Sequence, residues 1–149
     1  MKSKWKIAFR GFLAGIVCAF LGSLIFAPLA TIITVLAEPP DSILRDDFFT
    51  LLFFALLFSV MFTLIPACVA GIVLAFRLSA RKKTEKEILC EGRLIGGLAG
   101  FFAALAMIAE MFFWDANWMT LLLAGLGILT SAGLGALGAR WLAGKKANL

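Results

Sequence analysis

Residues 48–76 read FFTLLFFALLFSVMFTLIPACVAGIVLAF, an apolar stretch of 29 residues without a charged side chain. A helix rises about 1.5 Å per residue, so about 20 residues cross about 30 Å of hydrocarbon. The stretch is therefore long enough to span a bilayer as one helix. Three further apolar stretches lie at 11–37, 94–114 and 116–139, and of these only 94–114 contains a charged residue, Glu110. Together they predict an all-α fold in which residues 1–149 form a single membrane domain, a four-transmembrane-helix bundle.

The composition supports a membrane protein. Hydrophobic residues make up 62% of the chain and charged residues 15%, with a mean hydropathy of +1.02. Soluble domains carry about 25% charged residues. Four spans in 149 residues leave no room for a soluble domain beside them.

The basic residues indicate the orientation of the spans. Thirteen of the 14 lysines and arginines precede the first span, lie in the loop 77–93 or follow the last span. Basic residues in short loops stay on the cytoplasmic side, which predicts cytoplasmic termini in an inner (plasma) membrane. The loop residues expected to contact anionic lipid headgroups are Arg77, Arg81, Lys82, Lys83 and Lys86. Because the charge is confined to the membrane borders, no nucleic-acid partner is expected.

The amino-terminal span has a second interpretation. A positive start and a small-residue site at Ala37 are also features of a cleaved secretory leader. The apolar run of 27 residues exceeds the ~7 to 15 of a leader, which favours a retained span. Pro39 and Pro40 cannot continue a helix, so this span is expected to end by Ala37.

Small residues recur at every fourth position of each span, in rows at 11–27, 55–75, 92–104 and 127–139. In the second span, six of the nine Gly, Ala, Ser, Thr and Cys residues share one register. Membrane helices associate through close packing of such residues, so the rows predict helix contacts. Rows on all four helices further suggest a homo-oligomer or another membrane protein as partner. The predicted packing residues are Gly11, Gly15, Ala19, Ser59, Thr63, Ala67, Gly71, Gly92, Gly96, Gly100, Gly127, Ser131 and Gly135.

Two local patterns concern the third span. Thr84 and Glu87 have the spacing of a capping box, which predicts that this helix begins near Thr84. The segment from Arg93 to Gly100 also resembles the segment from Arg10 to Gly15 that opens the first span. Duplication of a two-helix hairpin would produce this similarity, as would ordinary membrane-helix composition.

The usual catalytic side chains are scarce. The chain has no histidine and no tyrosine, which removes the commonest general base and metal ligand. Cys18 and Cys68 lie inside spans and Cys90 in the cytoplasmic loop, with no Cys-x-x-Cys pair. We therefore expect no enzyme, no cofactor and no metal site.

Two functional hypotheses remain. The first is an accessory or regulatory protein that acts on another membrane protein through helix packing. The alternative is a minimal oligomeric channel or secondary transporter that uses Glu110 and a kink at Pro66. Glu110 is the one acid inside an otherwise uncharged stretch, but it lies about one turn from Asp115, and this position favours an interfacial role for Glu110 over a coupling role.

Overall fold

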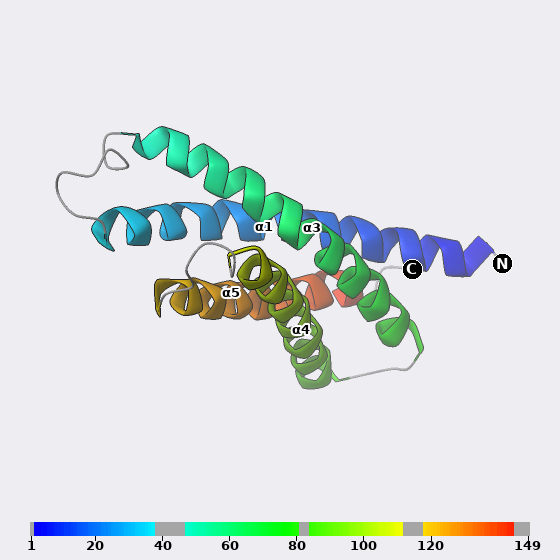
Figure 1. The fold of residues 1–149 in the computed structure, drawn as a ribbon. Coiled ribbons are helices and arrows are strands. Elements are labelled where there is room, and N and C mark those ends of the chain that lie inside the picture. The colour runs from blue at the N-terminus through cyan, green and yellow to red at the C-terminus, as the bar shows by residue number, and fades with distance from the viewer. Residues whose placement is uncertain (1, 38–46, 81–83, 112–117, 145–149) are drawn as a thin grey trace.

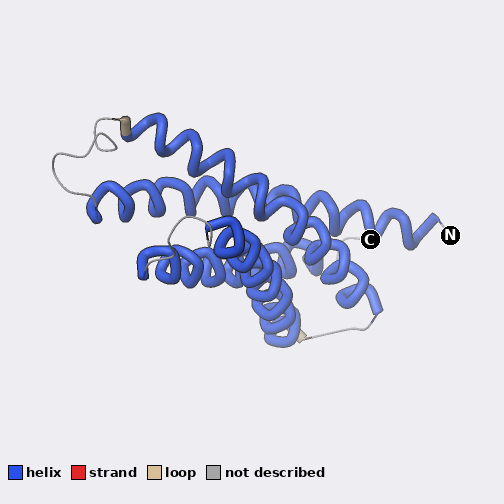
Figure 2. Tube along the Cα trace, viewed as in Figure 1, coloured by secondary structure: helices blue, strands red, loops and turns tan. Residues whose placement is uncertain are grey.

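The computed structural model describes residues 2–37, 47–80, 84–111 and 118–144. These residues form four helices, α1 (Lys2–Ala37), α3 (Phe48–Ala80), α4 (Glu85–Met111) and α5 (Trp118–Gly144), drawn in Figure 1. The described residues contain no strand, as Figure 2 shows, and the all-α prediction is confirmed. All four helices are long and apolar enough to cross a membrane.

Prolines act differently at the end of α1 and inside the helices. α1 ends at Ala37, two residues before Pro39, as the sequence predicts. Pro28 lies inside α1 and Pro66 inside α3, and both helices continue through them. A proline removes one backbone hydrogen bond of its helix, and long apolar helices packed against neighbours can tolerate that loss.

The start of α4 is a capping box, as predicted. The backbone N–H of Thr84 donates to Oε2 of Glu87 at 2.8 Å, and the Thr84 hydroxyl donates to the same oxygen at 2.9 Å. The Glu87 N–H in turn donates to Thr84 Oγ1 at 3.4 Å. These bonds satisfy amide groups that a helix start leaves free, and they fix where α4 begins after the loop.

Replacing Thr84 by alanine removes the cap and is expected to destabilise the first turn of α4 by about 1 kcal/mol. Amide hydrogen exchange at Glu87 and Ile88 should then be about fivefold faster, measured by mass spectrometry on the whole protein. The amides of α3 serve as the internal control, because α3 makes no bond to Thr84. Unchanged exchange at Glu87 would show that the box does not stabilise the helix start.

The four helices are arranged as two hairpins. α1 packs antiparallel to α3 and α4 antiparallel to α5, and most contacts between helices lie within these two pairs. The helices of each pair cross obliquely (Figure 1). Fewer contacts join one hairpin to the other. Between the hairpins, Leu74 and Leu78 of α3 pack with Ile95 of α4 and Ala139 of α5 near the start of α4.

Most side chains buried in the bundle are small. Ten alanines are buried among the described residues, and the large buried side chains there are Leu74, Leu78, Ile95, Leu123 and Leu134. Of the described residues, the largest side chain that is fully buried is Ser23. Large apolar side chains face outward instead: Phe49 is 83% exposed and Leu129 is 74% exposed. This is the reverse of a soluble protein, and it matches helices that pack through small residues while larger ones face lipid.

Candidate functional site

Glycines bring α1 and α3 into backbone contact. A methyl group at Gly11 would collide with the carbonyl oxygen of Gly71 and lie 2.8 Å from the Cβ of Ala75. One turn further along α1, a methyl group at Gly15 would collide with the carbonyl oxygen of Ala67. Ordinary carbon contacts lie at about 3.5 to 4.0 Å, so only glycine permits this approach.

The second hairpin is built in the same way. A methyl group at Gly92 would lie 2.5 Å from the carbonyl oxygen of Gly135 and 2.6 Å from the Cβ of Ala139. One turn later, a methyl group at Gly96 would collide with the carbonyl oxygen of Ser131. The small-residue rows of α4 and α5 therefore face each other, as those of α1 and α3 do.

The two hairpins repeat one packing arrangement. Gly92 follows Gly11 by 81 positions, and Gly135 follows Gly71 by 64 positions. The same two offsets relate all the contacts described in the two preceding paragraphs. The hairpins are thus two equivalent units, each a pair of helices joined through glycine and small-residue contacts.

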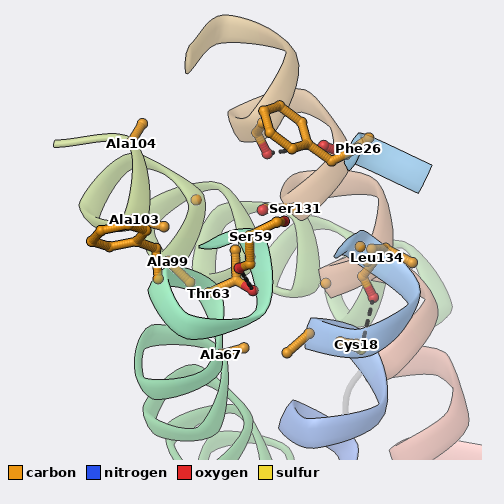
Figure 3. Close-up of a pocket in the computed structure, with 18 of the residues that line it drawn as sticks. Cys18, Phe26, Ser59, Thr63, Ala67, Ala99, Ala103, Ala104, Ser131 and Leu134 are labelled. Atoms are coloured by element: carbon orange, nitrogen blue, oxygen red, sulfur yellow. Dashed lines mark hydrogen bonds between the residues drawn. The ribbon is translucent and has the colours of Figure 1, made fainter. Parts of the chain in front are cut away.

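A cavity of about 550 Å³ lies between the hairpins, lined by residues of all four helices (Figure 3). Its walls are mainly apolar, with Phe26 contributed by α1 and with Phe58 and Phe62 stacked along α3 at a ring separation of 6.4 Å. No charged side chain is among the described residues that line it. The volume lies within the ~300 to 1,000 Å³ of small-molecule sites.

Three hydroxyl groups form one cluster at the α1–α3 contact: Ser23, Ser59 and Thr63, called the hydroxyl cluster below. The Ser59 hydroxyl donates to Ser23 Oγ at 3.1 Å, and Thr63 Oγ1 lies 3.4 Å from Ser23 Oγ. The Thr63 hydroxyl donates to the backbone carbonyl of Ser59 at 2.6 Å. Ser59 and Thr63 line the cavity, whereas Ser23 lies behind them and is fully buried.

The predicted packing residues and the cavity lining largely coincide. Eleven of the 13 residues line the cavity, and only Gly11 and Gly92 do not. All 13 lie in the helices described, where they are buried or partly buried. The rows predicted the contacts between helices, but no sequence signal indicated that a cavity lies beside those contacts.

The other predicted site residues do not join this site. Pro66 lies in α3 next to the lining residue Ala67 but does not line the cavity itself. Glu110 belongs to α4, and its side chain lies outside the described residues. Of the basic loop residues, Arg77 and Lys86 are exposed, and 81–83 lie outside the described ranges.

Cysteine and carboxylate groups are not gathered at the cavity. Cys18 lines it and donates its thiol hydrogen to the carbonyl oxygen of Leu134 at 3.6 Å. Within the described ranges, no three His, Cys, Asp or Glu side chains are grouped to hold a metal ion.

The chain matches no family model, no curated protein and no solved structure.

Proposed function

We propose that the chain is a multi-pass membrane protein that binds a small, neutral molecule in the cavity between its hairpins and carries it across the bilayer. One observation carries the proposal: a cavity lined by all four helices lies at the interface of two equivalent units. Substrate sites of many transporters lie at such an interface between structural repeats. A cavity without a charged wall among its described residues favours an uncharged substrate.

The packing supports a relative movement of the two hairpins. Within each hairpin, glycine contacts leave no space for sliding, whereas the contacts between hairpins are fewer. Carriers with repeated units work by rocking one unit against the other around a central site. Leu74, Leu78 and Ile95 join the hairpins at one end and are the natural pivot for this motion.

The proposed location is the inner (plasma) membrane, with both termini in the cytoplasm. The distribution of basic residues supports this orientation, because 13 of the 14 lysines and arginines precede the first span, lie in the loop 77–93 or follow the last span. The outward-facing phenylalanines and leucines support lipid as the surrounding solvent. In this orientation Arg77 and Lys86 are placed to contact anionic headgroups.

An accessory role through helix packing remains the second proposal, and self-association belongs to it. The small-residue rows suggested this role, but in the structure these residues pack against other helices of the same chain. A partner would therefore have to bind the large apolar side chains outside. The cavity has no part in that role, which is why we favour the carrier.

A cavity-filling variant tests the proposal in lipid vesicles. The probe is octan-1-ol that carries an aliphatic diazirine, and its adducts are mapped by mass spectrometry after illumination. A side chain at Gly127 would meet only the Phe26 ring, at 3.6 Å, so Gly127→Leu is expected to extend into the cavity. Labelling of cavity residues should fall about tenfold, as for a loss of about 1.4 kcal/mol in binding.

Gly133→Leu is the matched control on the same helix. No atom lies within 4 Å of a Cβ at Gly133, and this residue does not line the cavity. The control should keep the labelling of the unaltered protein. Labelling that is equal in the two variants, or confined to outward-facing residues, would contradict a binding site in the cavity.

A further inference from the structure

The hydroxyl cluster has no hydrogen left to donate into the cavity. Thr63 gives its single hydroxyl hydrogen to the Ser59 carbonyl, at 2.6 Å, so it cannot also donate to Ser23. Ser23 is therefore the donor in the 3.4 Å contact with Thr63. Ser59 gives its own hydrogen to Ser23. Each of the three hydroxyl hydrogens is donated within the cluster or to the backbone. The cluster can therefore only accept further hydrogen bonds, through its oxygen lone pairs.

The threonines of the cavity wall are oriented in the same manner. Thr31 and Thr34 donate to backbone carbonyls four residues earlier in α1, each at 2.9 Å. Thr130 donates to the carbonyl of Leu126 at 2.7 Å. These hydroxyls also offer lone pairs rather than hydrogens. Ser131 is the remaining hydroxyl of the described wall, and its side chain packs against Gly100 at the α4–α5 contact.

The two equivalent hairpins differ at the cluster. The offsets that relate the glycine contacts place Ala104, Leu123 and Gly127 at the positions equivalent to Ser23, Ser59 and Thr63. None of these three residues has a polar side chain. The α1–α3 hairpin therefore carries most of the hydrogen-bond acceptors of the cavity, and the α4–α5 hairpin is apolar at the positions equivalent to the cluster, with Thr130 and Ser131 as the hydroxyl residues of its described wall.

We infer that the occupant of the cavity is a neutral, amphipathic hydrogen-bond donor, such as an alcohol or an amide N–H compound. Its polar head lies against the lone pairs of Ser59 and Thr63, and its apolar part lies toward Ala104 and Gly127. A molecule that only accepts hydrogen bonds finds no partner at the cluster and leaves it unsatisfied. This inference rests on the proposed binding site and names the chemistry of its ligand.

Two probes of nearly equal shape test the inference in lipid vesicles. One is the diazirine-bearing octan-1-ol, and the other is its methyl ether, which cannot donate a hydrogen bond. Adducts on cavity residues are counted relative to adducts on outward-facing residues of the same chain, which corrects for partition into the lipid. The alcohol should label the cavity about three- to tenfold more than the ether, the range expected for one neutral hydrogen bond.

Substitutions at Ser59 test whether the hydroxyl cluster causes the preference for the alcohol over the ether. Ser59→Ala should bring the ratio of alcohol to ether labelling close to one, whereas Ser79→Ala on the same helix should leave it unchanged. Ser79 donates to Ala75 and does not line the cavity. If the alanine variant does not fold, Ser59→Cys keeps the shape and offers a much weaker acceptor, with the same expected loss.

The outcomes separate the inference from the proposed function. Equal labelling of the cavity by both probes would contradict the inferred hydrogen-bond donor but not the binding site. The same holds for a preference for the alcohol that is lost in Ser131→Ala and kept in Ser59→Ala. Labelling that Gly127→Leu does not reduce overturns both. Competition by monooleoylglycerol indicates a ligand that enters from the bilayer, and competition by hexan-1-ol alone indicates a soluble alcohol; either result supports the donor.

Discussion

Gly71→Val is expected to lower the free energy of unfolding by about 3 kcal/mol, at the upper end of the cost of overpacking a core. The new side chain would collide with the carbonyl oxygen of Gly11 and lie 2.9 Å from the amide nitrogen of Gly15. Backbone atoms cannot rotate out of the way as a side chain does, so α1 and α3 must separate. Thermal unfolding in detergent should show a melting temperature lower by about 6 to 12 °C.

Gly133→Val is the control for the loss of glycine and the gain of a β-branched residue. No atom of another helix lies within 4 Å of a Cβ at Gly133, so this variant should stay within about 0.5 kcal/mol of the unaltered protein. Equal melting temperatures for Gly71→Val and Gly133→Val would mean that α1 and α3 are not in backbone contact.

Gly135→Val, in the second hairpin, is expected to lower the free energy of unfolding by the same amount as Gly71→Val in the first hairpin. The surroundings are similar, because a Cβ at Gly135 would collide with the carbonyl oxygen of Gly92 and lie 3.0 Å from the amide nitrogen of Gly96. The variant with both valines should lose about 6 kcal/mol, since effects at sites without shared partners add. Chemical denaturation in mixed micelles measures all three variants on one scale.

The additivity is itself informative. Two hairpins that pack as separate units give a sum, whereas a single interlocked core gives a double variant that departs from it by more than about 0.5 kcal/mol. A Gly135→Val protein that is as stable as the unaltered one would contradict the equivalence of the two hairpins.

The features that the sequence predicts are those that depend on local spacing. The end of α1 follows from Pro39, and the start of α4 follows from the hydrogen bonds between Thr84 and Glu87. The small-residue rows predict which faces of the helices are buried, since Gly15 and Gly96 have no side chain to keep a neighbour away. Each of these signals comes from a few residues of one helix.

The register of the repeat could not be predicted from the sequence, because the sequence similarity between the two hairpins suggests a different alignment. Alignment on Arg10 and Arg93 places Gly92 before the repeat begins. The packing instead makes Gly11 equivalent to Gly92, two positions away from that alignment. A spacing of four residues occurs many times in a glycine-rich helix, and only the partner helix distinguishes one register from the next.

The cavity could not be predicted for a related reason. Its walls come from four helices, and its existence depends on how far apart the hairpins lie rather than on any residue alone. The hydroxyls of Ser23 and Ser59 are ordinary membrane-helix residues until their 3.1 Å contact is known. Glu110 drew attention as a lone acid, yet the described side chains around the cavity include no charge.

An interior whose largest fully buried side chain is a serine changes how this protein can evolve. In a soluble protein, an exchange between leucine and phenylalanine in the core lowers stability, because it changes the packed volume. Surface positions of such a protein carry mostly polar residues. In the proposed membrane setting, outward positions such as Phe49 and Leu129 can exchange among large apolar residues, because lipid adapts to any of them. At fully buried alanines such as Ala27 and Ala139, we expect serine to be tolerated better than leucine, because the added volume of leucine has no space. Natural variation in this chain should therefore be sorted by the volume of the residue rather than by its hydrophobicity.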